Sequence, residues 1–121
     1  MRILLIDDDA FLRDMYATKF RELGHTIDAA QTAENALLKL TDGEYDVVLM
    51  DMVMPGMNGV ELLKEINAKK LGGSPKVIML SNQSEESDKE AAMREGAIGY
   101  IVKAEFIPSE VVDKVLKTVE K

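Results

Sequence analysis

The chain has 121 residues, of which 46% are hydrophobic and 31% charged, a balance that fits one folded globular domain and excludes a disordered chain. Its net charge of −7 disfavours direct binding to nucleic acid, and the absence of cysteine excludes disulfides and thiolate chemistry. No apolar run reaches the roughly 18 residues of a membrane-spanning helix, so we expect no membrane span, and the absence of cysteine favours a cytoplasmic location.

Apolar runs of strand length recur along the chain. The strong ones cover residues 3–6, 47–50, 77–80 and 98–102, and a weaker one lies near residues 25–30. Because these runs are continuous rather than alternating, they indicate strands that are buried on both faces.

Apolar residues at helical spacing separate these runs and predict five helices. Gly24 can end the first helix, Thr32 can cap the second, Ser87 and Glu90 suggest a capping box in the fourth, and Pro108 opens the fifth. The apolar residues that mark the helices, in order, are Leu12, Tyr16, Phe20 and Leu23; Ala33, Ala36, Leu37 and Leu40; Val60, Leu63 and Ile66; Ala91, Ala92 and Met93; and Val112, Val115, Leu116 and Val119.

Strands that alternate with helices predict an α/β fold, in which a parallel sheet carries helices on both of its faces. We expect one domain over residues 1–121, in which the fifth helix runs to Lys121 and no output domain follows.

Side chains of complementary chemistry follow four of the predicted strands, and the carboxyl ends of parallel strands meet at one edge of a sheet. Two carboxylates about 4 Å apart repel by roughly 4 kcal/mol at an effective dielectric near 20, so such a cluster favours a bound cation. Oxygen ligands and room for water suit Mg²⁺. The residues, strand by strand, are Asp7, Asp8 and Asp9; Asp51; Ser81; and Lys103.

A carboxylate beside a cation can accept a phosphoryl group. The metal and Lys103 would neutralise the phosphoryl oxygens, and the Ser81 hydroxyl would donate a hydrogen bond to one of them. Each of these residues taken singly is an ordinary turn residue. The prediction depends on the combination, since the ends of four strands together supply carboxylates, one hydroxyl and one ammonium group.

Four segments resemble, in order and spacing, the receiver domains of two-component response regulators. They are ILLIDDDAFLRDMY, VVLMDMVMPGMNGVELL, VIMLSNQ and GAIGYIVKAEF, and the resemblance covers essentially the whole chain. The stretch from Asp51 to Gly59 is its most specific part. The resemblance implies a flavodoxin-like, doubly wound sheet of five parallel strands in the order 2-1-3-4-5.

The resemblance also implies a metal site for Mg²⁺ or Mn²⁺. Asp51 matches the phosphoacceptor, and Asp7 and Asp8 match the acidic pair. Asp8 would bind the ion directly, Asp7 largely through water, and the backbone carbonyl of Val53 would complete the set. Asp9 is expected to be a neighbour rather than a ligand.

The remaining family positions form a switch. Ser81 matches the switch hydroxyl, Lys103 the catalytic lysine, and Tyr100 the aromatic residue that changes rotamer on activation. The donor would be a phosphohistidine on a sensor histidine kinase or a phosphotransfer protein. An unidentified output protein would bind the face built by the fourth helix, fifth strand and fifth helix. We expect the chain to be a monomer or a weak dimer. Self-phosphorylation and slow autodephosphorylation do not make such a protein an enzyme.

The chain departs from the family pattern after the fifth strand and beside the phosphoacceptor. Ala104 stands where proline is usual, and a non-proline cis bond costs about 2.5–4 kcal/mol, so we expect a trans peptide after Lys103 and a locally different loop. Val53 and Gln83 occupy positions that influence the hydrolytic water. An apolar Val53 cannot orient a water, which predicts a long-lived phosphoryl group. Asn82 replaces a small residue and could restrict donor access.

Two other functions stay open. A pseudo-receiver would only scaffold partners, although the intact set of site residues argues against it. An aspartyl-nucleophile phosphatase usually has a second Asp two residues after the first, where this chain has Val53. His25, the only histidine, is expected to be structural because it lies at the entrance to a strand rather than on a helix. No nucleotide-binding motif is present.

Overall fold

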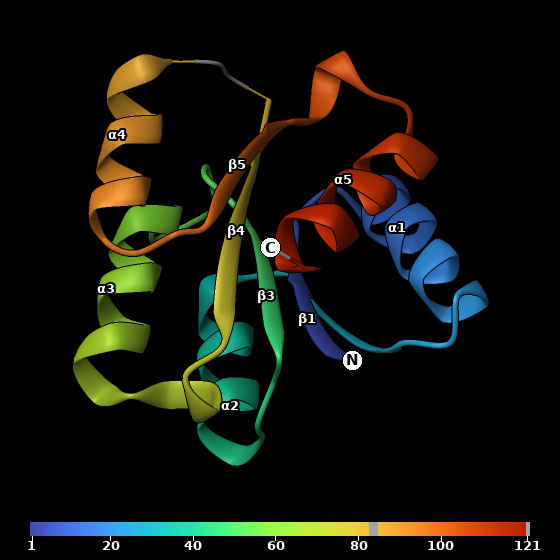
Figure 1. Ribbon diagram of the computed structural model, residues 1–121. Helices are drawn as coiled ribbons and strands as arrows, with labels where there is room; N and C mark the ends of the chain where they lie inside the picture. The colour runs from blue at the N-terminus through green and yellow to red at the C-terminus, as the bar shows by residue number, and fades with distance from the viewer. Residues whose placement is uncertain (83–84, 121) are drawn as a thin grey trace.

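The computed structural model describes residues 1–82 and 85–120 and contains one parallel sheet (Figure 1). The strand order is β2-β1-β3-β4-β5, and every neighbouring pair is parallel, as predicted. The strands are β1 (Arg2–Ile6), β2 (Thr26–Ala30), β3 (Val47–Asp51), β4 (Lys76–Ser81) and β5 (Gly99–Val102).

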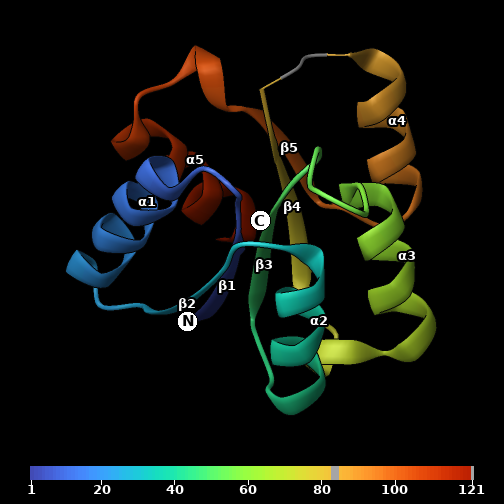
Figure 2. The ribbon, with the colours of Figure 1, turned by 180° about the vertical axis from the view of Figure 1, so that it is seen from behind.

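Helices cover both faces of the sheet, so the molecule has three layers (Figures 1 and 2). The described helices α1 and α5 pack on one face, and α2, α3 and α4 pack on the other. Within residues 1–82 and 85–120, no helix combines the length and the apolar character needed to traverse a lipid bilayer. The elements are α1 (Ala10–Glu22), α2 (Ala33–Asp42), α3 (Gly59–Lys69), α4 (Glu86–Arg94) and α5 (Pro108–Glu120), with 3-10 turns η1 (Leu71–Gly73) and η2 (Lys103–Glu105).

Burial follows strand position and explains the unequal sequence signals. Every residue of the central strand β3 is buried, which matches its unbroken apolar run. The edge strand β2 is only partly buried and contains Asp28, so its pattern is weaker.

Most of the predicted helix ends are confirmed. Gly24, with φ of 88°, follows the last turn of α1, and Pro108 begins α5. The Thr32 side chain accepts a hydrogen bond from the Asn35 N–H at 3.1 Å, which caps α2.

Two helix predictions are wrong. Leu23 does not belong to the buried stripe of α1, because the helix ends at Glu22 and the Leu23 side chain is 59% exposed. The capping box at Ser87 is absent, since α4 begins at Glu86 and Ser87 already lies inside its first turn. The capping box instead begins α3, where Asn58 and Glu61 exchange hydrogen bonds, and sequence reasoning missed it.

Gly59 lets α3 begin directly against the end of β3. Its N–H donates to the Met52 carbonyl at 2.8 Å. A Cβ at this position would lie 2.9 Å from the Asp51 carbonyl oxygen and 3.1 Å from the Met52 Cα. A side chain here would therefore push the backbone that carries Asp51.

We expect Gly59→Ala to lower the free energy of unfolding by about 1–3 kcal/mol, the range for overpacked sites. Urea unfolding measures this change. Gly43→Ala is the matched control, because its Cβ would mainly meet the flexible Arg2 side chain at 3.3 Å. Equal stability losses in the two variants would contradict the role of close packing.

Candidate functional site

The register of the sheet brings four strand ends to one level. Ile6 pairs with Met50, so Asp7 follows β1 at the height at which Asp51 ends β3. On the other side, Asp51 pairs with Leu80, and Ser81 is the last residue of β4. Ser81 in turn pairs with Val102, after which Lys103 begins η2. The fold thus collects residues separated by almost the whole chain.

Lys103 joins two buried carboxylates at the centre of this edge. Its Nζ donates to Asp7 Oδ2 and to Asp51 Oδ2, each at 3.0 Å. All three side chains are buried. Both ion pairs are therefore shielded from water, and removal of Lys103 would leave two buried carboxylates without a compensating charge.

The loop after β1 holds Asp7 in place through further hydrogen bonds. The Asp9 N–H donates to Asp7 Oδ1 at 2.9 Å, and the Asp9 side chain accepts from the Leu12 N–H at 3.1 Å, which caps α1. Arg13 donates from Nη1 to the Asp7 carbonyl at 2.8 Å. Sequence reasoning missed Arg13, because its contact with the Asp7 carbonyl depends on a side-chain rotamer that residue spacing does not encode.

Three carboxylates converge on a space that suits a divalent cation. Asp7, Asp8 and Asp51 offer oxygens that all lie within 4.8 Å of one another, and Asp8 is exposed while the other two are buried. Three formal negative charges and the one Lys103 ammonium leave a charge of −2. Oxygen-only ligands with one solvent-facing side match the preferences of Mg²⁺.

The buried pair of Asp51 and Lys103 has shifted pKa values. Burial raises the pKa of the Asp51 carboxyl, and the attraction of Lys103 only partly opposes this effect. Burial by itself would lower the pKa of the Lys103 ammonium, but its contacts with Asp7 and Asp51 outweigh burial, so the pKa is raised. Lys103 therefore stays charged, while an ionised Asp51 needs a second cation.

The immediate neighbours of Asp51 come from its own loop. The Val53 N–H donates to Asp51 Oδ1 at 3.2 Å, and the Val53 side chain is 60% exposed. A side chain that is exposed and apolar offers no hydrogen bond to water beside the carboxylate.

Ser81 and Tyr100 are linked across β4 and β5. Ser81 is buried, Tyr100 is half-buried, and their side chains share a hydrogen bond. Burial raises the pKa of the Tyr100 hydroxyl, and the bond with Ser81 partly opposes that shift. Tyr100 thus connects the acidic site at the strand ends to β5, which is an edge strand of the sheet.

The chain reverses after β5 without a cis bond. The peptide after Lys103 is trans, as predicted, because the described residues contain no cis peptide. The segment forms the 3-10 turn η2, and Ala104 is exposed. Asn82 is also exposed, and Gln83 lies outside the described residues.

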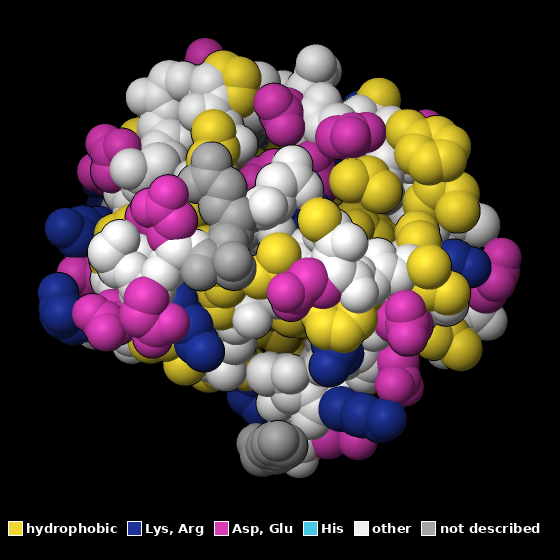
Figure 3. All heavy atoms as spheres, turned by 90° about the horizontal axis from the view of Figure 1, so that it is seen from above, with side chains coloured by type: hydrophobic (Ala, Val, Ile, Leu, Met, Phe, Trp, Pro, Cys, Tyr) yellow, Lys and Arg dark blue, Asp and Glu magenta, His cyan; other side chains and the backbone are white. Residues whose placement is uncertain are grey.

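The surface around this edge mixes acidic and hydrophobic side chains. Viewed from above, acidic side chains lie near the middle of the face, and hydrophobic side chains gather over the side of α1 and α5 (Figure 3). Phe11 at the start of α1 is 70% exposed, and Ile107 before α5 is 62% exposed.

Residues 3–116 match the family model described as "Response regulator receiver domain". The chain belongs to this family. Its members are signalling proteins rather than true enzymes, and receiver domains take phosphoryl groups from histidine kinases. The acidic triad found here is typical of the Mg²⁺ site of receivers.

Curated relatives show the same family at moderate identity. The chain is 33% identical over 103 residues to the two-component response regulator PhoP of Pseudomonas aeruginosa, covering 85% of this chain and 45% of that protein. It is 34% identical over 114 residues to the transcriptional regulatory protein ResD of Bacillus subtilis, covering 94% of this chain and 46% of that protein. The chain spans about half the length of these relatives.

Solved receiver structures have the same fold. The response regulator TrrA of Thermotoga maritima, in complex with Mg²⁺ and BeF, is 36% identical, has a TM-score of 0.81, and shares 97% of both chains. A CheY-like receiver of Methanospirillum hungatei is 26% identical with a TM-score of 0.88, covering 98% of this chain and 93% of the other.

The raised pKa of Asp51 predicts a pH-dependent cost to folding. Because folding raises this pKa above the ordinary value of 3.8, stability is lost as the pH rises from that value and Asp51 ionises. We expect Asp51→Asn to raise the free energy of unfolding at pH 7 without divalent cation, by about 1 kcal/mol. Lys103 keeps Asp7 as its partner in this variant.

The gain should shrink as the pH is lowered toward 3.8, and urea unfolding at a series of pH values measures it. Mg²⁺ at one hundred times its Kd should stabilise the wild type by about 2.7 kcal/mol and the variant by much less. Asp42→Asn, at an exposed position, is the control and should change neither quantity. A gain that is independent of pH would contradict the assigned cause.

Proposed function

We propose that this chain is a phosphoacceptor switch of a two-component phosphorelay, in which Asp51 takes a phosphoryl group from a phosphohistidine. The donor is a sensor histidine kinase or a phosphotransfer protein. The single observation that carries the proposal is the pair of 3.0 Å bonds from Lys103 to the buried Asp7 and Asp51. A buried carboxylate held against an ammonium, beside two more acids, is placed for phosphoryl transfer.

In the transfer, an Asp51 carboxylate oxygen attacks phosphorus. A P–O bond forms as the P–N bond to the donor imidazole breaks, and the electron pair of that bond stays on the imidazole nitrogen, which takes a proton from solvent. Lys103 neutralises charge on the phosphoryl oxygens, and the Ser81 hydroxyl donates to one of them.

The metal ligands in this proposal are Asp8, Asp51 and the Val53 carbonyl, with Asp7 acting largely through water. A bound Mg²⁺ or Mn²⁺ supplies positive charge to the phosphoryl oxygens. The donor set fits this role because its three carboxylates include one exposed member, which leaves a side open to water and to the donor.

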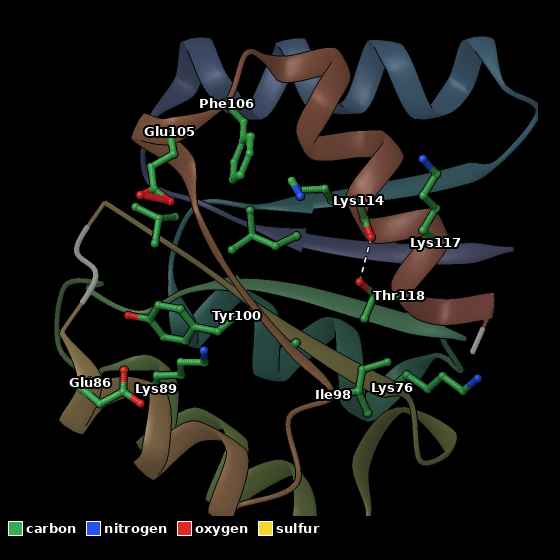
Figure 4. A pocket seen from close by; sticks show the side chains of 13 residues that line it. Lys76, Glu86, Lys89, Ile98, Tyr100, Glu105, Phe106, Lys114, Lys117 and Thr118 are labelled. Carbon is green, nitrogen blue, oxygen red and sulfur yellow. Dashed lines mark hydrogen bonds between the residues drawn. The ribbon is translucent and has the colours of Figure 1, made fainter.

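The phosphoryl group on Asp51 carries about −1.5 to −2 charges, in place of the single charge of the ionised carboxylate. Ser81 turns toward the phosphoryl group, and its bond to Tyr100 is lost. Tyr100 then changes rotamer and repacks the face of α4, β5 and α5 (Figure 4), which binds the output protein. The domain works in the cytoplasm as a monomer or weak dimer. Phosphorylation acts by shifting the population between two conformational states.

Incubation with Mg²⁺ and a small phosphodonor tests this function. We expect the intact mass to rise by one phosphoryl group in the wild type, and the adduct to be absent in Asp51→Asn. Asp46→Asn, at an exposed site away from the acidic edge, should still form the adduct. No adduct with any donor or kinase would favour a scaffold, and repeated turnover of a small phosphate ester would favour a phosphatase.

Val53 predicts a long-lived phosphoryl group, because its exposed apolar side chain cannot position the hydrolytic water. We expect Val53→Asn to speed the loss of the phosphoryl group several-fold, since an amide can hydrogen-bond that water. The decay of the phosphorylated mass after donor removal measures this rate. Leu38→Asn, at a similarly exposed position on α2, should leave the rate unchanged. An unchanged rate in Val53→Asn would refute the role of this side chain.

A further inference from the structure

Asp8 reaches the acidic edge from a backbone that other residues hold in place. Its side chain is exposed, and within residues 1–82 and 85–120 it makes no hydrogen bond and no ion pair. An oxygen of Asp8 nevertheless lies within 4.8 Å of oxygens of Asp7 and Asp51. The direction in which Asp8 points is therefore set by its main chain rather than by contacts of its carboxylate.

Three hydrogen bonds fix the main chain around the peptide that joins Asp7 to Asp8. The Asp7 N–H donates to the Ala30 carbonyl at 3.1 Å, and the Asp9 N–H donates to Asp7 Oδ1 at 2.9 Å. The third bond comes from Arg13 Nη1, which donates to the Asp7 carbonyl at 2.8 Å. This carbonyl lies in the same peptide plane as the Asp8 N–H, so Arg13 fixes the plane from which Asp8 begins.

Arg13 is presented by the first turn of α1, which follows β1 after a short loop (Figure 2). Its N–H donates to the Asp9 carbonyl at 2.9 Å, which closes that turn. The side chain is half-buried, and across the described ranges its guanidinium has one polar partner, the Asp7 carbonyl. The guanidinium is thus committed to the loop and to no carboxylate of the described chain.

We propose that Arg13 is a positioning residue of the metal site, which holds the peptide between Asp7 and Asp8 so that the Asp8 carboxylate is directed at the bound cation. The inference rests on the metal site of the proposed function. Groups that hydrogen-bond metal ligands from outside the coordination shell commonly change metal affinity by roughly 10- to 100-fold. Arg13 acts through the backbone of the ligand, so it is not a catalytic residue.

The charge of Arg13 and its hydrogen bond affect the cation in opposite directions. A guanidinium near the acidic edge repels a divalent cation, so removal of the charge alone would strengthen Mg²⁺ binding. Removal of the bond frees the peptide before Asp8, and the cation must then order that loop as it binds, which weakens binding. The sign of the change in Mg²⁺ affinity therefore distinguishes positioning from electrostatics.

Calorimetric titration of the unphosphorylated protein with Mg²⁺ measures this affinity without any phosphodonor. Arg13→Met removes the charge and the bond but keeps a long side chain that suits a helix. We expect the Kd for Mg²⁺ to rise roughly tenfold. An unchanged or lower Kd would overturn the inference.

Arg21→Met is the matched control, because Arg21 lies on the same helix and donates from Nη2 to the Ile27 carbonyl at 3.3 Å. This variant loses the same charge and a bond of the same kind, but the bond lies near the amino end of β2 rather than at the acidic edge. We expect its Kd for Mg²⁺ to stay unchanged. Equal increases in Kd in the two variants would assign the effect to helix stability and would overturn the inference.

A double-mutant cycle tests whether Arg13 acts through Asp8. Asp8→Asn should weaken Mg²⁺ binding, and Arg13→Met should add little in that background, because the carboxylate that Arg13 directs is already lost. Additive losses would place the effect of Arg13 on another ligand and would overturn the inference.

Urea unfolding checks that each variant is folded. If Arg13→Met does not fold, Arg13→Gln takes its place in every comparison, since its polar side chain is shorter by two atoms and suits a half-buried helical position. The same rise in Kd is expected, and an unchanged Kd in Arg13→Gln would overturn the inference.

Intact mass after incubation with a small phosphodonor separates this inference from the proposed function. A wild type that binds Mg²⁺ and forms the Asp51 adduct, with an unchanged Kd in Arg13→Met, overturns the inference and leaves the proposed function standing. A wild type that binds Mg²⁺ but never forms the adduct overturns the proposed function alone, because the Kd values still test the inference. A wild type that binds no Mg²⁺ overturns the inference.

Discussion

The contact between Lys103 and the two buried carboxylates Asp7 and Asp51 is the constraint on which the rest of the site depends. Two carboxylates in a dry environment repel each other and lose hydration, and an ammonium within 3.0 Å of both offsets these costs. The contact also joins β1, β3 and the turn after β5. Because Lys103 has one charge for several acids, the balance of the edge is completed by a divalent cation or by uptake of a proton.

The pairing of the parallel strands fixes the positions of these charged groups relative to one another. A shift of one residue in the pairing of β1 with β3 would turn Asp7 to the opposite face and separate it from Lys103. The register is fixed by the apolar runs of both strands, which are buried almost completely. Packing of the buried strand residues therefore determines which side chains meet at the acidic edge.

Much of this architecture follows from the sequence, because burial on both sheet faces leaves continuous apolar runs that any reader can count. The runs predict β1, β3 and β4 well, and their polar ends predict the acidic edge. Leu23 shows the limit of periodicity, which predicts the buried face of a helix but not the residue at which the helix ends. Ser87 shows a second limit, since a capping motif is recognised only relative to a helix start that packing determines.

Contacts between distant segments could not be predicted in the same way. The bond from Arg13 to the Asp7 carbonyl and the bond between Ser81 and Tyr100 depend on side-chain rotamers that no spacing encodes.

The bond shared by Ser81 and Tyr100 has a thermodynamic consequence. Because this bond connects the acidic edge to the face of α4, β5 and α5, the coupling free energy between phosphorylation and binding at that face is the same in either direction. In the proposed switch, a partner on the face of α4, β5 and α5 that holds Tyr100 in its second rotamer must stabilise the acyl phosphate by the same factor by which the acyl phosphate favours that partner. The output partner of the proposed switch would therefore regulate the signal as well as read it.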